Sequence, residues 1–306
     1  MPAFHIQRSS VINASREAVF DAIADYGTWP TWSPWLGIDA DAKVTTSDEP
    51  ASVGGNYQWS GPVVGAGSMK HLKLDRPSST EDQLRFIKPF KSVSSVRFDI
   101  EPAGNETRVT WHMDGNLPWF LFFMKSSMET FVGMDYERGL SMLKEFVETG
   151  AVASKLEVMG EESVSAKRLI GVQASSSLDE IGVAMGRALE QVTSALDTDS
   201  PPGQLMSCYL ASSDMKQRRF DFISGFEHPD SVVPSGLICH EIPKARYLRI
   251  RHTGRYEHLG NAWSGGYQYA RAHKMKIAKR EGLEVYVNNP SNTAPEDLIT
   301  DIYLPL

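Results

Sequence analysis

The sequence contains almost no cysteine: Cys208 and Cys239 are the only two in 306 residues. Two thiols in a chain of this length provide no disulfide framework, which indicates a reducing compartment. They are too few for a zinc site built from cysteines, and no CxxC pair occurs. The histidines of the C-terminal half share no metal-binding spacing. We therefore expect no metal and no other cofactor.

Long apolar runs are also missing. The run from Leu117 to Met124 is far shorter than the roughly twenty residues that a membrane-spanning helix needs. The first residues, Met1 to Arg8, lack the apolar stretch of a signal peptide. These two absences predict a cytoplasmic protein without a membrane partner.

An excess of positive charge is absent as well. The chain has 31 basic and 38 acidic side chains, which give a net charge of −7. Nucleic acids and anionic membranes attract proteins through a positive field, so we expect no direct nucleic-acid binding. The composition, 41% hydrophobic and 23% charged, is typical of globular proteins, and the length allows two domains.

The first half of the chain shows the order of elements of a helix-grip fold. An alternating run from Phe4 to Val11 predicts a strand, and apolar spacing predicts a helix from Arg16 to Tyr26 with Ser15 as its N-cap. A long amphipathic helix is predicted from Ser126 to Thr149. Between the helices lie five strand-like runs: Asn56–Ser60, Gly67–Leu74, Gln83–Ile87, Ser92–Ile100 and Thr107–Asp114. A curved sheet around a long helix often leaves a ligand cavity.

Short motifs in this half resemble the polyketide cyclase-like branch of the START/SRPBCC superfamily. The carriers are Trp32-Ser33-Pro34-Trp35, Tyr57-Gln58-Trp59-Ser60-Gly61, Gly65-Ala66-Gly67-Ser68-Met69, Thr107-Arg108-Val109-Thr110-Trp111, and Gly139-Leu140 with Leu143-Lys144. The match covers residues 1–150. The resemblance implies a helix-grip domain that binds lipids, polyketides or other hydrophobic molecules, with enzymatic activity in only some members.

Six of the seven tryptophans lie in this half. Indole rings suit either a hydrophobic core or the wall of a ligand site. We take Trp59 and Trp111, on predicted strands, as candidate ligand-binding residues, with a core position as the alternative. No Ser/His/Asp constellation accompanies them, so this half shows no visible chemistry.

The second half contains an internal repeat, after a predicted linker at Thr149–Val158 that is rich in Ala and Ser. The order strand, helix, strand, strand occurs twice, some seventy residues apart. The first pass comprises Ser163–Ser176, Leu178–Leu196, Gln204–Ala211 and Arg219–Phe226. The second comprises Gly236–His252, Leu259–Arg280, Leu283–Asn288 and Asp301–Leu306.

One strand of the second repeat carries an unusual carboxylate. Alternation places Leu283, Val285 and Val287 on one face of this strand, and Glu284 and Tyr286 on the other. A glutamate amid β-branched and aromatic residues lies either on a solvated face or in a pocket that uses its charge.

The second half resembles the GyrI-like effector-binding domain, which also occurs in multidrug-responsive transcription regulators. The carriers are Leu283-Glu284-Val285-Tyr286, Asn288-Asn289-Pro290, Pro295-Glu296-Asp297-Leu298, Ile302-Tyr303-Leu304-Pro305-Leu306, His252-Thr253-Gly254-Arg255-Tyr256, and Trp263. The resemblance implies a domain at residues 155–306, made of two β-α-β-β repeats. It also implies that Glu284 lies at the base of an aromatic-lined cleft and meets cationic or polar groups of a ligand.

Candidate residues of that cleft follow from position and type. Around Glu284 we expect six aromatic residues: Trp263, Tyr209, Tyr256, Phe226, Tyr286 and Tyr303. Aromatic faces around one carboxylate suit a delocalised organic cation. The alternative is that Tyr209, Phe226 and Tyr303 are ordinary core residues.

The sequence thus predicts an α+β protein in which a helix-grip domain precedes a GyrI-like domain. The first functional hypothesis is a protein that binds a small hydrophobic or cationic ligand, as a sensor in transcriptional or stress response without its own DNA-binding domain. The second is a hydrolase of reactive compounds with Glu284 as general base and Tyr209 or Tyr256 as hydrogen-bond donor; a cyclase activity of the first domain is a weaker variant. The third is an interaction protein similar to a gyrase inhibitor. Ligand identity and oligomeric state stay open.

Overall fold

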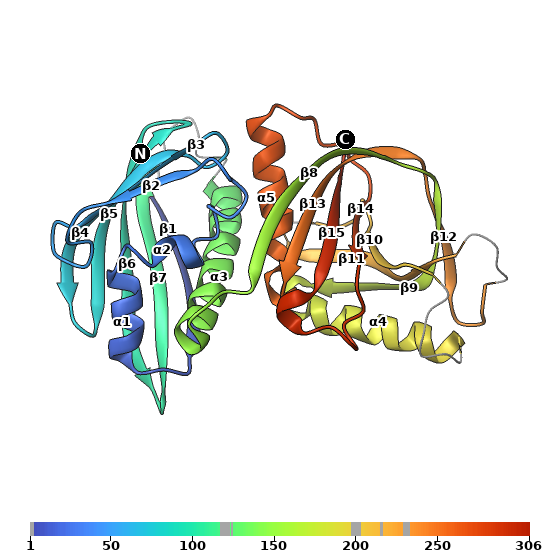
Figure 1. Ribbon diagram of the computed structural model, residues 1–306, viewed down its shortest axis with the longest axis horizontal. Coiled ribbons are helices and arrows are strands. Elements are labelled where there is room, and N and C mark those ends of the chain that lie inside the picture. Colours follow the sequence, from blue (N-terminus) through green and yellow to red (C-terminus); the bar gives the residue numbers. More distant parts are fainter. Residues whose placement is uncertain (1–2, 117–122, 124, 197–202, 215–216, 229–232) are drawn as a thin grey trace. The chain divides into compact units, whose positions relative to one another are not determined.

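The chain is described by a computed structural model that covers residues 3–116, 123, 125–196, 203–214, 217–228 and 233–306 (Figure 1). It divides into two compact units, Met1–Val152 and Ala153–Leu306. No helix in these ranges is long and apolar enough to span a membrane.

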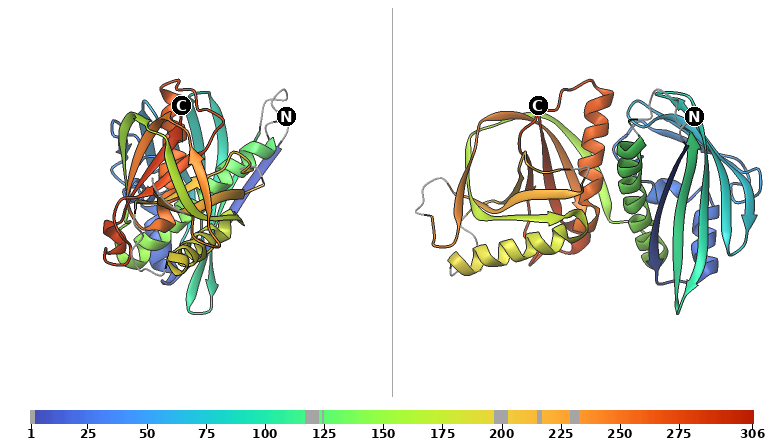
Figure 2. Two further views of the ribbon diagram at one scale, coloured as in Figure 1. Left: turned by 90° about the vertical axis from the view of Figure 1, so that its right-hand side faces the viewer. Right: turned by 180° about the vertical axis from the view of Figure 1, so that it is seen from behind.

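The first unit is a seven-stranded antiparallel sheet against which helices pack, in the strand order β1-β7-β6-β5-β4-β3-β2. Its strands are β1 (Ala3–Ile12), β2 (Lys43–Thr46), β3 (Asn56–Gly61), β4 (Gly65–Asp75), β5 (Ser79–Lys88), β6 (Ser92–Ala103) and β7 (Glu106–Asn116). Its helices are α1 (Arg16–Ala24), α2 (Trp29–Trp32) and α3 (Lys125–Thr149). The long helix α3 lies along the sheet (Figures 1 and 2), so the predicted helix-grip fold is confirmed.

Local sequence explains where the helices of this unit begin. Ser15 caps α1 as predicted, because its Oγ accepts a hydrogen bond from the Ala18 amide at 3.2 Å. The one-turn helix α2 lies in a segment with two prolines, Pro30 and Pro34. Pro30 is tolerated there because it stands in the first turn, where no intrahelical amide donor is needed.

Aromatic rings fill the space between the sheet and α3. Trp111, only 2% exposed, stacks on Phe98 at 4.9 Å and on Tyr136 of α3 at 3.9 Å between ring centroids. The edges of three further indoles meet it: Trp29, Trp32 and Trp35. Among the residues that the structure describes, the Trp111 indole N–H has no hydrogen-bond partner. Trp111 is therefore packed at the centre of the core.

Trp59 occupies a different environment. It is half-buried on β3, with its ring 6.0 Å from Phe86 and against the backbone of Gly67, where an added Cβ would lie 2.3 Å from the indole. A ligand role for Trp59 or Trp111 stays a prediction.

The second unit is an eight-stranded antiparallel sheet in the order β12-β9-β11-β10-β14-β15-β13-β8. Its strands are β8 (Ser154–Val164), β9 (Lys167–Ser177), β10 (Leu205–Tyr209), β11 (Arg219–Glu227), β12 (Ile238–Ile242), β13 (Ala245–Gly254), β14 (Gly282–Tyr286) and β15 (Ile299–Pro305). Its helices are α4 (Ile181–Leu196) and α5 (Leu259–Ala272), with short 3-10 turns at Leu178–Glu180, Tyr256–His258 and Pro295–Asp297.

The strand order shows the predicted duplication directly. Read outward from the central pair β10 and β14, equivalent strands of the two repeats follow on either side, and β12 and β8 form the edges. Helix α4 packs on β9 and β11 of the first repeat, and α5 on β13 and β15 of the second (Figures 1 and 2). The two repeats β9-α4-β10-β11 and β13-α5-β14-β15 confirm the expected β-α-β-β pattern.

Three predicted boundaries in this unit are wrong. Strand β8 begins at Ser154, inside the segment expected to be a linker. The strand expected at Gly236–His252 is split into β12 and β13 around Pro243, which has no amide hydrogen for a ladder bond. Helix α5 ends at Ala272, well before Arg280, and Lys274 adopts a positive φ of 56° that ends a helix.

The aromatic core of the first unit generates a prediction. We expect Trp111→Ala to lower the free energy of unfolding by about 3–5 kcal/mol, because it removes a fully packed indole and leaves a cavity. Trp59→Ala, which removes a half-buried ring, should cost less than half as much. Urea denaturation followed by near-UV circular dichroism measures both values. Equal losses for the two variants would contradict the central role of Trp111.

Candidate functional site

The centre of the second sheet places one carboxylate between the two repeats. In the β10–β14 pair, Ser207 lies opposite Glu284 and Tyr209 lies opposite Gly282. Because side chains alternate along a strand, Glu284 and Tyr286 share a face, and Leu283 and Val285 point to the other. Glu284 is only 2% exposed. The predicted alternation is therefore correct, and Glu284 does not lie on a solvated face.

Three side chains donate hydrogen bonds to this buried carboxylate. The Tyr209 hydroxyl donates to Oε1 at 3.0 Å, and the Trp263 indole Nε1–H donates to the same oxygen at 2.7 Å. The Tyr286 hydroxyl donates to Oε2 at 3.1 Å. The donors come from β10, α5 and β14, so both repeats contribute to the site.

A glycine makes room for the indole. Gly282 precedes Glu284 by two residues and therefore faces the same side of the sheet. An added Cβ at Gly282 would lie 2.7 Å from the Trp263 ring. Tyr209, opposite Gly282, meets the indole edge-on at 5.1 Å between centroids. The absence of a side chain at Gly282 thus lets Trp263 reach the carboxylate.

A further set of contacts fixes the two tyrosine hydroxyls. Ser207 Oγ lies 3.0 Å from the Tyr286 hydroxyl and 2.7 Å from Ser224 Oγ, and both serines are fully buried. Met185 of α4 places its sulfur 3.8 Å from the Tyr209 hydroxyl and 3.9 Å from the Tyr286 hydroxyl. These contacts orient both hydroxyls toward Glu284.

Four residues of the site were not predicted from the sequence: Met185, Ser207, Ser224 and Gly282. The duplication carried a signal for two of them. Ser207 pairs with Glu284 across the pseudo-symmetric centre, so it is the position of the first repeat that corresponds to Glu284. Met185 on α4 occupies the place over the central strands that Trp263 occupies on α5.

Burial controls the electrostatics of the site. Loss of solvation raises the pKa of Glu284, while the hydrogen bonds from Trp263, Tyr209 and Tyr286 act in the opposite direction. Burial and the nearby Glu284 charge raise the pKa of Tyr256 to about 12. Within the described ranges, no Lys, Arg or His side chain pairs with Glu284. Its negative charge therefore has hydrogen-bond donors but no countercharge from the protein.

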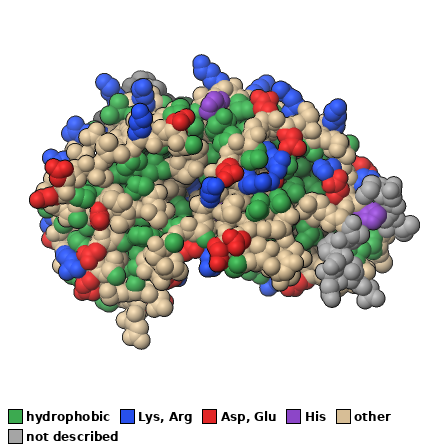
Figure 3. Space-filling model, viewed as in Figure 1, with side chains coloured by type: hydrophobic (Ala, Val, Ile, Leu, Met, Phe, Trp, Pro, Cys, Tyr) green, Lys and Arg blue, Asp and Glu red, His purple; other side chains and the backbone are tan. Residues whose placement is uncertain are grey.

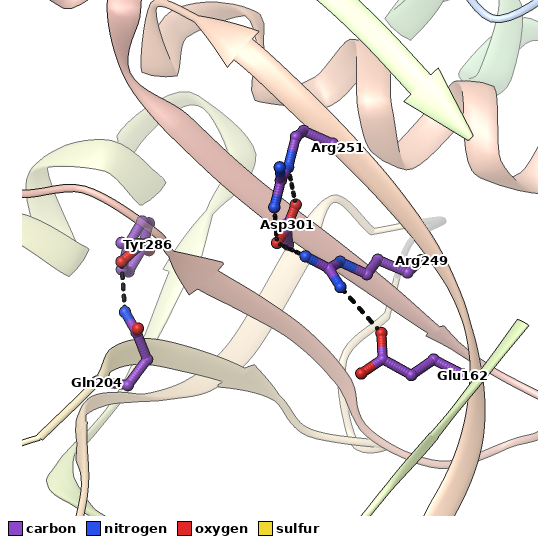
Figure 4. Close-up of polar contacts among 6 residues, drawn as sticks. All are labelled: Glu162, Gln204, Arg249, Arg251, Tyr286 and Asp301. Atoms are coloured by element: carbon purple, nitrogen blue, oxygen red, sulfur yellow. Dashed lines mark hydrogen bonds and ion pairs between the residues drawn. The ribbon is translucent and has the colours of Figure 1, made fainter. Parts of the chain in front are cut away.

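The opposite face of the same sheet shows the contrasting case (Figure 4). Asp301 is also 2% exposed, but two arginines neutralise it. Arg249 Nη2 lies 2.6 Å from Oδ2, and Arg251 donates from Nε at 2.8 Å and from Nη2 at 2.9 Å. Arg249 also pairs with Glu162 at 3.1 Å. The fold can thus supply cations to a buried carboxylate and does so for Asp301.

The structure brings together five of the seven residues predicted for the second domain. Besides Glu284, Trp263, Tyr209 and Tyr286, these include Tyr256, whose ring lies 5.6 Å from Tyr286. Trp263, Tyr209 and Tyr256 are partly exposed, so they form the accessible side of the group.

Two predicted residues lie elsewhere. Tyr303 pairs with Leu283 in the sheet and so points to the opposite face, where it meets Tyr247 and Arg249. Phe226 packs at the end of β11 in a core cluster with Ile170, Val192 and Leu237. Trp59 and Trp111 belong to the first unit.

No site for a metal ion is evident in the part of the chain that the structure describes, where no group of three or more His, Cys, Asp or Glu side chains converges. Charges of both signs are interspersed on the face shown in Figure 3.

Comparison with protein families agrees with the two resemblances. Residues 3–148 match the family described as polyketide cyclase / dehydrase and lipid transport. Residues 161–306 match the GyrI-like small molecule binding domain. The chain is a fusion of these two kinds of domain, as its motifs predict. No curated protein matches the chain.

Several solved structures are similar to about half of the chain. Protein CV1439 from Chromobacterium violaceum is 17% identical, covers 47% of this chain and 98% of its own, and has a TM-score of 0.37. The Aha1 dimer from Colwellia psychrerythraea is 19% identical, with coverages of 48% and 97% and a TM-score of 0.36. SAV2435, in a structure bound to tetraphenylphosphonium, is 12% identical, with coverages of 49% and 93% and a TM-score of 0.39.

The raised pKa of Glu284 predicts a pH-dependent effect of its replacement. The pKa of Glu284 in the folded state lies above its unfolded value of 4.5. The folded wild type therefore loses stability as the pH rises from 4.5 through the folded-state pKa, because its carboxyl group loses the proton that the folded state binds more tightly. We expect Glu284→Gln, which carries no charge, to melt at a higher temperature than the wild type at pH 8. The difference should shrink toward pH 4.5. Thermal unfolding of both proteins from pH 4 to pH 8 measures it.

The matched control is Glu296→Gln, which removes an exposed carboxylate. Its melting temperature should follow that of the wild type at every pH. A Glu284→Gln variant that is less stable than the wild type by the same amount across the whole range would contradict the prediction.

Proposed function

We propose that the second domain binds lipophilic organic cations at Glu284. The observation that supports this proposal is a fully buried carboxylate that accepts three hydrogen bonds from neutral groups and pairs with no cationic side chain among the described residues. A buried charge without a partner is costly, and a ligand cation that pairs with it recovers part of that cost.

The side chains around Glu284 favour a particular type of cation. Trp263, Tyr209 and Tyr256 are partly exposed and present aromatic rings beside the carboxylate. Aromatic faces attract cations and also bury apolar substituents. A large, weakly hydrated cation with aromatic or aliphatic groups satisfies both requirements better than a small hydrated ion. This chemistry agrees with the small-molecule binding that both domain types indicate.

Binding fits the geometry better than hydrolysis. A general base needs a free lone pair and a pKa near the working pH. Burial raises the pKa of Glu284, but three of the roughly four lone-pair sites of the carboxylate already accept hydrogen bonds, which lower its basicity. We therefore place the protein among ligand-binding proteins, and infer that it senses or sequesters the cation in transcriptional or stress response through a partner.

A pair of ions of equal size and opposite charge tests the proposal. We expect tetraphenylphosphonium to raise the melting temperature of the wild-type protein by mass action, and tetraphenylborate to have no such effect. Glu284→Gln should weaken tetraphenylphosphonium binding at least tenfold, a loss of about 1.4 kcal/mol. Isothermal titration calorimetry on the full chain gives the affinities.

Glu296→Gln again serves as the charge-matched control and should bind like the wild type. Trp263→Phe keeps an aromatic ring but removes the indole donor, so it should retain cation binding. Equal binding of both ions, or undiminished cation binding by Glu284→Gln, would overturn the proposal.

A further inference from the structure

A cavity of about 200 Å³ lies on the face of the second sheet opposite Glu284. Its apolar lining comes from Met206 of β10, Leu283 and Val285 of β14, Tyr303 of β15 and Val164 of β8. Met206 and Leu283 are almost completely buried, at 0% and 1% exposure. The floor of this cavity is therefore the reverse side of the two central strands that carry the Glu284 site.

The charged groups at the rim of the cavity are already paired. Lys167 Nζ lies 2.5 Å from Glu227 Oε2, and Glu162 pairs with Arg249 at 3.1 Å (Figure 4). A charged ligand would have to compete with one of these pairs or share a partner whose charge is already neutralised. The rim thus disfavours ions of either sign, in contrast to Glu284.

Uncharged polar groups at the rim remain available. Ser163 and Ser165 are exposed, and within the described ranges their hydroxyls make no hydrogen bond to the protein. Gln204 also lines the cavity, and its amide nitrogen donates to the main-chain oxygen of Tyr286 at 2.5 Å. That bond leaves the Gln204 side-chain oxygen at the rim as an acceptor.

We propose that this cavity is a second ligand site, which binds a small neutral molecule with an apolar body and one hydroxyl or carbonyl group. The apolar body would contact Val285 and Tyr303, directly above the buried Met206 and Leu283, and the polar group would bind Ser163, Ser165 or Gln204. Its volume of about 200 Å³ is below the roughly 300–1,000 Å³ of sites for drug-sized ligands, so the ligand is the size of a single substituted ring. This site does not depend on the charge of Glu284.

Two methionines report separately on the two faces of the sheet. Met206 lies at the floor of the cavity, and Met185 touches the tyrosines of the Glu284 site. In full-length protein labelled with 13C at the methionine methyl groups, we expect p-cresol to shift the Met206 signal in a saturable manner. Met206→Leu and Met185→Leu assign the two signals. The anion p-toluate and the cation 4-methylbenzylammonium, of similar size, should bind at least tenfold more weakly.

A variant that fills the cavity provides the decisive control. Val285→Phe places an aromatic ring in the cavity and should abolish the Met206 response, whereas Val287→Phe, at an exposed position outside the lining, should preserve it. Glu284→Gln should also preserve it. If the methyl spectrum shows that the Val285→Phe variant is not folded, Ser165→Phe at the exposed rim serves as the variant that blocks the cavity.

Three results would overturn this inference. They are a Met206 signal that p-cresol does not move, a response that persists in the blocking variant, or a response confined to Met185. The last result would assign p-cresol to the Glu284 site. Failure of tetraphenylphosphonium to bind would leave the Met206 result unaffected, so the two proposals are tested independently.

Discussion

The second domain is organised around an unneutralised buried charge. Glu284 sits where the two repeats meet, at 2% exposure, and a donor reaches it from β10, from β14 and from α5. Two of these donors depend on other residues of the sheet: Gly282 leaves space for Trp263, and Ser207 fixes the hydroxyl of Tyr286. Asp301, equally buried on the other face, receives two arginines. Since this same sheet neutralises one carboxylate and not the other, the lack of a cation at Glu284 is a property of that site and not of the fold.

Duplication explains how such a site arises within a small domain. The pseudo-symmetric sheet sets Ser207 against Glu284 and gives each repeat a tyrosine two residues later, Tyr209 and Tyr286. The helices then differ, with Met185 on one and Trp263 on the other. One repeat supplies the charge and the indole donor, and the other supplies small or polarisable groups that hold the hydroxyls in place. The two halves are therefore equivalent in backbone and complementary in chemistry.

Much of this arrangement could be predicted from local patterns. Alternation in β14 separates Leu283 and Val285 from Glu284 and Tyr286, and family motifs identify both domains. What could not be predicted depends on pairing between distant strands. Residue type does not reveal that Tyr303 lies opposite Leu283 and so faces away from Glu284, or that Phe226 packs at the far end of β11. In the first unit, the indole of Trp111 suits a core as well as a ligand wall, and only its stacking between Phe98 and Tyr136 locates it in the core.

The cost of burying Glu284 has a consequence for the protein in the cell. A domain that sacrifices stability for an unpaired charge is unfolded more often when no cation occupies it, and unfolded chains are what proteases degrade. On the proposed function, a bound cation would therefore lengthen the lifetime of the protein. The quantity of the protein, and not only its occupancy, would then rise and fall with the supply of ligand. On this proposal, a site that is incomplete without its ligand would be a means of controlling abundance, with no change in transcription.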